Sequence, residues 1–201
     1  YPPEDLLLRP SIGLRVEQSL ATLCAAMKGS AYLVIGYPLR VDGTLYNAAG
    51  VLHRGQIVAQ YFKQLLPNYQ VFDEKRYFTA GGEPCVVNIN GVAVGLSICE
   101  DIWESTPTLQ ATQAGAQLLL NINSSPYHLD KRLERWETVA ARAREAGIPI
   151  VYVNQVGGQD ELVFDGGSFA GQYHRASTVA ATTGVVRHLA GAGAGGSRLR
   201  Q

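Results

Sequence analysis

The sequence predicts a single α/β domain, and three observations indicate this class. Strand-like apolar runs alternate with helical patterns along the chain. Several of these runs are apolar throughout, which is typical of strands that are covered on both faces. The length of 201 residues suits one domain, in which 46% of the residues are hydrophobic and 17 basic side chains balance 17 acidic ones. This charge balance disfavours nucleic acid or an anionic membrane surface as the main partner.

The first half of the chain reads as one helix followed by strands. Apolar positions three and four residues apart predict a helix over 11–28, and they are Ile12, Val16, Leu20, Leu23 and Met27. An apolar run bounded by glycine and proline predicts a strand over 31–36, and similar runs predict strands over 45–52 and 57–62. Residues 63–83 have neither period, and such long irregular segments in compact domains are usually functional or disordered. The aromatic residues of this segment disfavour disorder.

In the second half, Asn90-Gly91 between two alternating runs predicts a β-hairpin with strands over 84–89 and 92–98. The remaining predicted elements are helices over 105–115 and 130–146 and strands over 118–123 and 148–154. After Phe169 the composition shifts to Ala, Gly, Thr and Arg. We therefore expect the domain to occupy residues 1–169, with an atypical Ala/Gly-rich tail over 170–201.

The cysteine pattern and the absence of long apolar stretches bear on the location of the protein. Cys24, Cys85 and Cys99 are an odd, sparse set without CxxC spacing, which disfavours a disulfide framework or a zinc site and suggests a reducing compartment. No apolar stretch approaches the roughly 20 residues that span a bilayer, and no signal peptide is visible. We therefore expect a cytoplasmic protein with no membrane and no nucleic-acid partner.

One cysteine and three charged residues are candidates for chemistry. Cys99 ends an apolar strand and precedes a predicted helix, where backbone N–H groups favour a thiolate and an oxyanion. Position alone leaves open the alternative that Cys99 is a small buried hydrophobe. Glu4 follows Pro-Pro, Lys63 follows an apolar strand, and Glu74 lies in the irregular segment. Each of these charged residues, taken alone, is more often a solvated surface group.

Five segments occur together and in order: YPPEDLLLRP, FKQLLPNYQVFDEKRYF, GLSICEDIW, NINSSPYHLDKRLER and YVNQVGGQDELVFDGGSF. They resemble the nitrilase superfamily of carbon-nitrogen hydrolases and, more narrowly, the glutamine amidotransferase domain of glutamine-dependent NAD synthetases. The resemblance covers about residues 1–169. It implies a nitrilase-type α-β-β-α sandwich that is N-terminally truncated, because the first strand, helix and further strand of the family would precede Tyr1.

The resemblance also implies roles for individual residues. Glu4 matches the general base, Lys63 the catalytic lysine and Cys99 the nucleophile of the family's triad. The other matching positions are Tyr69, Ser125 and Lys131 as glutamine contacts, Glu74 as a second acidic residue near the triad, and Glu100 as a backbone N–H donor to the oxyanion.

The activity that the resemblance implies is hydrolysis of the glutamine amide through a cysteine thioester. The ammonia would serve the conversion of deamido-NAD to NAD by a synthetase domain that is absent from this chain. We expect no cofactor or metal in the glutaminase domain, ATP and magnesium only in the synthetase domain, and a homo-oligomer when complete. Two alternatives stay open: a free-standing amidase acting on another small amide, and an inactive fragment. We expect the chain alone to be a weak enzyme that makes no NAD.

Overall fold

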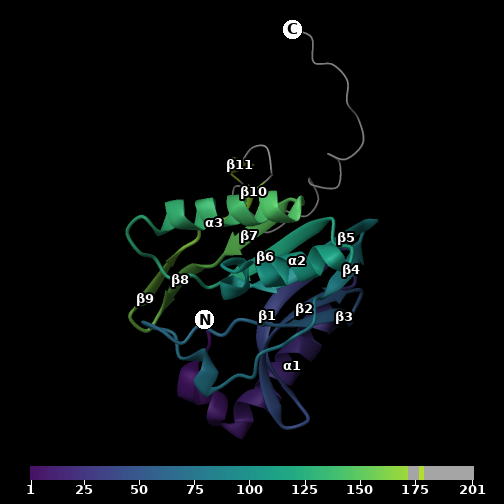
Figure 1. Cartoon of the computed structure of the whole chain (residues 1–201). Helices are drawn as coiled ribbons and strands as arrows, with labels where there is room; N and C mark the ends of the chain where they lie inside the picture. Colours follow the sequence, from purple (N-terminus) through teal and green to yellow (C-terminus); the bar gives the residue numbers. More distant parts are fainter. Residues whose placement is uncertain (172–176, 179–201) are drawn as a thin grey trace.

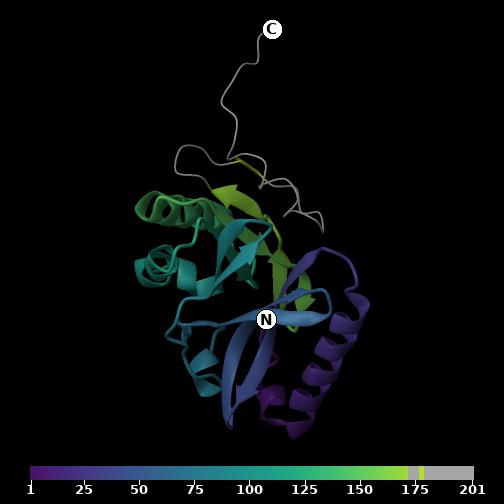
Figure 2. The ribbon, with the colours of Figure 1, turned by 90° about the vertical axis from the view of Figure 1, so that its right-hand side faces the viewer.

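The computed structural model describes residues 1–171 and 177–178, which form four layers (Figure 1). One helix covers the outer face of a three-stranded sheet, that sheet packs on a second sheet, and two helices cover the far side (Figures 1 and 2). The predicted order of layers, α-β-β-α, is therefore confirmed.

The first sheet is an antiparallel meander with β2 in the middle. Its strands are β1 (Tyr32–Val41), β2 (Thr44–His53) and β3 (Gln56–Phe62). The helix α1 (Pro10–Ala26) packs on this sheet, where Leu20 meets Tyr37 and Ala48. All five apolar positions of the predicted stripe are buried or half-buried, whereas most of the other residues of α1 are exposed. The predicted amphipathic helix is thus confirmed.

The second sheet has the strand order β11-β10-β7-β6-β5-β4. Its strands are β4 (Val86–Ile89), β5 (Val92–Ile98), β6 (Leu118–Asn123), β7 (Ile150–Asn154), β10 (Phe169–Gly171) and β11 (Ser177–Thr178). The β4–β5 hairpin turns at Asn90 and Gly91, whose φ angles of 52° and 88° suit the tight hairpin turn that the sequence predicted.

The central strands β5, β6 and β7 run parallel, because helices connect them. These helices are α2 (Ser105–Gln113) and α3 (Lys131–Ala146), and both lie on the outer face of the sheet (Figure 1). The carboxyl ends of parallel strands meet at one edge of a sheet, which is where ligands bind in open α/β sheets. Cys99 and Ser124 directly follow β5 and β6 at this edge.

Besides the contact of α1 with the first sheet, two apolar cores hold the layers of the described structure together. The inner core lies between the sheets and joins Val51 and Tyr61 of the first sheet to Leu96 and Leu120 of the second. The outer core lies between the second sheet and the helices, where Leu119 and Ile150 meet Val139 of α3. Strands β5, β6 and β7 are therefore covered on both faces, which is the reason for their continuous apolar runs.

Three parts of the fold differ from the prediction. The strand predicted over 31–36 extends to Val41, because its pairing with β2 continues through Val41–Thr44. A hairpin of β8 (Val156–Gln159) and β9 (Leu162–Asp165) went unpredicted, since its glycines and acidic residues obscure any alternation. The sheet also continues past Phe169 into β10 and β11, while residues 172–176 and 179–201 of the predicted tail lie outside the described residues.

Among the residues that the structure describes there are also three short 3₁₀ turns: η1 (Glu4–Leu8), η2 (Glu74–Arg76) and η3 (Cys99–Ile102). Within the described part of the chain, no helix has both the length and the apolar character that crossing a membrane requires.

Candidate active site

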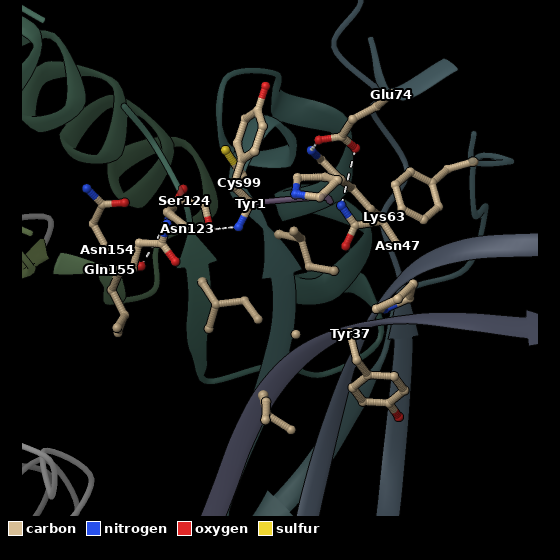
Figure 3. Close-up of a pocket in the computed structure, with 18 of the residues that line it drawn as sticks. Tyr1, Tyr37, Asn47, Lys63, Glu74, Cys99, Asn123, Ser124, Asn154 and Gln155 are labelled. Atoms are coloured by element: carbon tan, nitrogen blue, oxygen red, sulfur yellow. Dashed lines mark hydrogen bonds and ion pairs between the residues drawn. The ribbon is translucent and has the colours of Figure 1, made fainter. Parts of the chain in front are cut away.

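A cavity of about 380 Å³ lies between the two sheets at the carboxyl ends of the parallel strands. Its wall combines residues of β1 with residues that follow β3, β5, β6 and β7 (Figure 3). Three of the residues that the sequence singled out line it together: Lys63, Glu74 and Cys99.

Lys63 and Glu74 form a buried ion pair in this cavity. The Lys63 Nζ lies 2.7 Å from the Glu74 Oε1, and their side chains are 1% and 6% exposed. The Asn47 Nδ2 donates to the Glu74 Oε2 at 3.2 Å, so both carboxylate oxygens are engaged (Figure 3). Burial lowers the pKa of Lys63, but the negative charges of Cys99 and Glu74 and the hydrogen bond outweigh it, and the pKa is raised overall. Lys63 is therefore an ammonium ion at neutral pH.

The backbone around Lys63 is also fixed. Its N–H donates to the Asn47 carbonyl at 2.9 Å, and its carbonyl accepts from Gly81 N–H at 2.8 Å. Glu74 in turn lies in η2, whose first N–H donates to the Pro67 carbonyl at 3.1 Å. The irregular segment 63–83 is thus an ordered loop that carries two members of the site, as its lack of periodicity had suggested.

Cys99 follows β5 directly and opens η3. Its φ of 46° lies in the left-handed region, a conformation that costs a residue other than glycine about 1–2 kcal/mol. Such strain is typical of active sites, where the surrounding structure holds a side chain in a required direction. Burial raises the pKa of the thiol, Lys63 lowers it, and Glu74, Glu100 and Asp101 raise it further, so the pKa is raised overall. The resting group is therefore a thiol, and it requires a base before it can attack a carbonyl.

Glu100 belongs to η3 (Cys99–Ile102), which we call the cysteine turn, and Tyr69 lies beside this turn. Neither residue lines the cavity. The Tyr69 hydroxyl donates to the Glu100 Oε1 at 2.7 Å, and the tyrosine is about half exposed. Desolvation of Tyr69 and its hydrogen bond to the carboxylate raise the pKa of its hydroxyl. Tyr69 also packs edge-on against Phe72, which lines the cavity. The Tyr69 ring therefore lies outside the cavity, and the Phe72 ring stands between it and the cavity.

Ser125 and Lys131 are not among the cavity-lining residues. Ser125 is buried, and its hydroxyl accepts from the Arg135 Nε at 3.1 Å. Lys131 lies with its Nζ 4.2 Å from the centre of the Trp103 ring and 2.9 Å from the Glu134 Oε2. Because Trp103 directly follows η3, Lys131 is a partly exposed cation beside the cysteine turn.

The structure does not bring Glu4 to Lys63 and Cys99. Tyr1, Pro2 and Pro3 line the cavity, but Glu4 opens η1 with an exposed side chain. It borders a separate small hollow of about 20 Å³, which it shares with Glu74. The carboxylate that contacts the lysine is therefore Glu74, not Glu4.

Sequence reasoning missed several polar residues that build the site. Asn47 lies inside a strand that reads as apolar, and only its contact with Glu74 identifies it. Asp101 stands within the segment GLSICEDIW, and its position next to the apolar Ile102 could have indicated a buried carboxylate. Arg135 is 1% exposed and donates to the carbonyls of Ser125 and Pro126. Its burial was missed because the charged residues over 131–135 are typical of a solvated helix face.

In the part of the chain that the structure describes, no group of three or more His, Cys, Asp or Glu side chains is arranged to hold a metal ion. Among the polar groups that line the cavity, the side chains of Lys63, Glu74 and Cys99 supply an ammonium, a carboxylate and a thiol, a set suited to nucleophilic attack on a carbonyl.

Comparison with known families agrees with this geometry, because the family model for carbon-nitrogen hydrolases matches residues 14–184. The chain belongs to the carbon-nitrogen hydrolase family. Its relatives include proteins named glutamine-dependent NAD(+) synthetase. That of Xanthomonas campestris pv. campestris (strain 8004) is 51% identical over 170 residues, which are 84% of this chain and 31% of that protein. That of Aquifex aeolicus (strain VF5) is 44% identical over 84% of this chain and 30% of that protein. The chain thus spans about a third of the length of these relatives.

Solved structures show the same architecture. A glutamine-dependent NAD+ synthetase from Acinetobacter baumannii in complex with ADP superposes with a TM-score of 0.81 at 42% identity, covering 86% of this chain and 32% of that chain. A Nesterenkonia amidase of the nitrilase superfamily superposes with a TM-score of 0.76 at 25% identity, covering 88% of this chain and 67% of that chain. The predicted nitrilase-type fold of this carbon-nitrogen hydrolase is therefore confirmed.

Proposed function

We propose that this carbon-nitrogen hydrolase cleaves the side-chain amide of glutamine through a thioester on Cys99. The observation that carries the proposal is the meeting of Cys99 with the buried ion pair of Lys63 and Glu74 in one cavity. A related amidase from Nesterenkonia, 25% identical, carries the acetamide moiety of fluoroacetamide added covalently at its active site cysteine. The corresponding reactive group among the residues that line the cavity here is Cys99.

The reaction follows from the charges in the cavity. The Cys99 thiol gives its proton to a carboxylate as its sulfur bonds to the amide carbon, and the carbonyl oxygen becomes an oxyanion. The Lys63 ammonium stabilises the thiolate and the oxyanion, and its effect is strong because it is buried. The Glu100 N–H is the second proposed oxyanion donor.

The intermediate then collapses. The carbon–nitrogen bond breaks and the carboxylic acid returns its proton to the leaving group, which departs as ammonia and leaves a thioester. Water, deprotonated by the same carboxylate, attacks the thioester, and glutamate leaves as the sulfur recovers its proton. Within the described residues, Glu74 is the carboxylate that lines the cavity with Cys99. We therefore assign the proton transfer to Glu74, in place of the sequence-based assignment to Glu4.

Recognition of glutamine requires groups for its α-ammonium and α-carboxylate. We propose that Lys131 binds the α-carboxylate, because it is a cation beside the cysteine turn and only its Glu134 partner neutralises it in the described structure. Tyr69, joined to Glu100, flanks the same turn and supplies a hydroxyl and an aromatic wall. Ser125 acts indirectly, because its hydroxyl and its carbonyl accept from Arg135 and hold that side chain against the loop that follows β6.

We further propose that the ammonia is used to convert deamido-NAD to NAD by a synthetase domain with its own ATP and magnesium; support for NAD as the product comes from relatives named glutamine-dependent NAD(+) synthetase. These residues would then be the glutaminase part of a larger cytoplasmic homo-oligomer. The three cysteines are free in the structure, which is consistent with a reducing compartment.

Covalent labelling tests the proposal without requiring full turnover. The chain is incubated with a diazoketone analogue of glutamine, digested and analysed by mass spectrometry. We expect the label on Cys99, protection by excess glutamine, and loss of labelling in Cys99→Ala with an unchanged melting temperature. Cys24→Ala and Cys85→Ala are the matched controls and should label normally. A label on either of those cysteines instead, or labelling that glutamine does not compete with, would refute the assignment.

A second candidate is a general amidase for small aliphatic amides. It is favoured by the cavity wall, in which Val34, Ile35, Ile122 and Val153 are apolar while Ser125 and Lys131 do not line it. Hydrolysis of glutamine and of propionamide, compared as kcat/KM in the same preparation, separates the two. Equal values would favour the amidase, and a strong preference for glutamine would favour the proposal.

A further inference from the structure

Asp101 is a fully buried carboxylate that the proposed reaction does not use. It is 0% exposed, lies two residues after Cys99 in η3, and is not among the residues that line the cavity. Burial raises the pKa of Asp101, hydrogen bonds from Leu65, Ile98 and Tyr61 offset part of this effect, and the pKa is raised overall to about 6. The side chain is therefore ionised at neutral pH although it lies in the interior, which requires partners for both oxygens.

Those partners flank the two reacting side chains. The Asp101 Oδ1 accepts from the N–H groups of Gln64 at 3.1 Å and Leu65 at 2.8 Å, the two residues that follow Lys63. The Oδ2 accepts from Ile98 N–H at 3.0 Å, directly before Cys99. The Oδ2 also accepts from the Tyr61 hydroxyl at 2.8 Å, two residues before Lys63.

These four hydrogen bonds join the two sheets at one point. Tyr61 belongs to β3 of the first sheet, and Ile98 ends β5 of the second. The apolar core between the sheets tolerates small sliding movements, because apolar contacts have no direction. Hydrogen bonds to an ionised carboxylate are short and directional, and they fix the distance between the segments that they join.

We propose that Asp101 is a positioning residue that holds the Lys63 segment against the Cys99 turn and so keeps the ammonium at the distance at which it stabilises the thiolate. The inference rests on the proposed thiol chemistry of Cys99. It assigns to Asp101 no contact with substrate. Its consequence is that the charge of Lys63 acts on Cys99 only while this carboxylate is in place.

The substitution Asp101→Asn separates positioning from charge, because the two effects have opposite signs. The charged groups that bear on the Cys99 charge are Lys63 and the protonated Tyr1 α-amino group, which favour the thiolate, and Glu74, Glu100 and Asp101, which oppose it. The hydroxyls of Tyr69 and Tyr152 also interact with this charge and are unchanged in the variant. Removing the Asp101 charge alone makes the thiolate easier to form. Loss of positioning moves Lys63 away and makes it harder to form. The side-chain amide of the variant also places an N–H donor where Asp101 offers an acceptor to the Ile98 N–H and the Tyr61 hydroxyl. The set of four hydrogen bonds is therefore weakened without a change in the size of the side chain.

The experiment measures the rate of Cys99 alkylation by iodoacetamide against pH, without glutamine, in the full chain with Cys24 and Cys85 replaced by Ala. We expect the pH midpoint to rise in Asp101→Asn. We also expect kcat for glutamine, counted per Cys99 labelled by the diazoketone, to fall about 10- to 100-fold with KM within threefold. A midpoint that falls, or a kcat per labelled site within twofold of the parent, would overturn the proposal and leave Asp101 a merely structural residue.

Tyr61→Phe provides a second test if Asp101→Asn does not fold. It removes one of the four hydrogen bonds and no charge, and we expect a smaller rise of the midpoint and a kcat per labelled site lowered about 2- to 5-fold. The matched control is Tyr152→Phe, a tyrosine that is equally buried but whose hydroxyl makes no hydrogen bond to Asp101 in the described structure. Equal behaviour of the two phenylalanine variants would contradict the proposal. The alkylation measurement needs no substrate, so a failure of glutamine hydrolysis would leave this test intact.

Discussion

Replacement of Glu74 by Gln is the perturbation for which the structure gives the clearest magnitude. The variant keeps the size of the side chain and removes its charge, so the Lys63 ammonium loses the partner that lies 2.7 Å away. Both side chains are almost wholly buried, and breaking such a pair at one end costs about 3–5 kcal/mol, because it leaves an unpaired buried charge. For a chain of this size, that loss lowers the melting temperature by roughly 6–20 °C.

The same substitution should also affect the chemistry. Glu74 raises the pKa of Lys63, so the variant holds the ammonium less firmly, and it lacks the carboxylate proposed to move the proton. We expect turnover of glutamine to fall on the order of 10²–10⁴-fold, the usual contribution of a general acid–base group.

The pH dependence of stability follows from the raised pKa of Lys63. The folded-state pKa lies above the unfolded value of 10.5, so the stabilisation by the ion pair is fully present below pH 10.5. It is lost as the pH rises through the folded-state pKa. The difference in stability between the parent and Glu74→Gln should therefore be constant from pH 7 to 9 and shrink above pH 10.5.

The assay combines calorimetry or circular dichroism with glutamate release. The control is Asp5→Asn, because Asp5 forms an exposed ion pair with Arg76 at 3.1 Å, and such pairs contribute at most about 1 kcal/mol. Two results together would refute the reasoning. One is a melting temperature of Glu74→Gln within about 2 °C of that of Asp5→Asn, roughly the size of the control effect. The other is turnover within about threefold of the parent, well short of the loss expected for a general acid–base group.

Three further predictions concern the other candidate residues. Lys63→Met should leave labelling of Cys99 possible but lower kcat about 10²–10³-fold, measured by glutamate release, because a buried cation is replaced by an apolar chain of similar length; an unchanged kcat would exclude Lys63 from the site. Glu4→Gln should retain kcat within about twofold, since Glu4 is exposed and outside the cavity; a loss as large as that of Glu74→Gln would restore the assignment of the base to Glu4. Lys131→Met should raise KM for glutamine far more than it lowers kcat, as steady-state kinetics would show, whereas an equal effect on propionamide would rule out an interaction with the α-carboxylate.

The sequence predicted those elements whose residue pattern reflects the geometry of a helix, a buried strand or a tight turn. The stripe of α1 and the apolar runs of β5, β6 and β7 repeat the geometry of their elements, and Asn90-Gly91 supplies the backbone angles that a tight hairpin needs. The hairpin of β8 and β9 escaped because its residues are exposed or half-exposed in the main, so no alternation of apolar and polar residues marks it. Its pairing depends on backbone hydrogen bonds, which any sequence can supply.

The candidate site was predictable in part for a related reason. Cys99 and Lys63 became candidates because one ends a predicted apolar strand and the other follows one, but position alone left a non-catalytic role open for both. Their roles came from the resemblance. Glu74 and Glu4 could not be ranked from the residues alone, since both are acidic residues in segments without a period. The resemblance placed Glu4 in the triad, whereas the structure places Glu74 at hydrogen-bond distance from Lys63. The decision depends on a contact across eleven positions, which no local pattern encodes.

The irregular segment shows why such contacts escape local patterns and why they matter for function. Its N–H groups cannot pair in a sheet, so they find partners singly: Leu65 with the Asp101 carboxylate, Thr79 with the Leu45 carbonyl, and Gly81 with the Lys63 carbonyl. Each partner lies elsewhere in the chain or across the loop, so the conformation is fixed by tertiary contacts. A segment that is fixed in this way can present Lys63 and Glu74 into a cavity without the alternation that a strand imposes on its side chains. The same freedom from periodicity that makes the segment hard to predict is therefore what allows an ammonium and a carboxylate to meet beside the thiol.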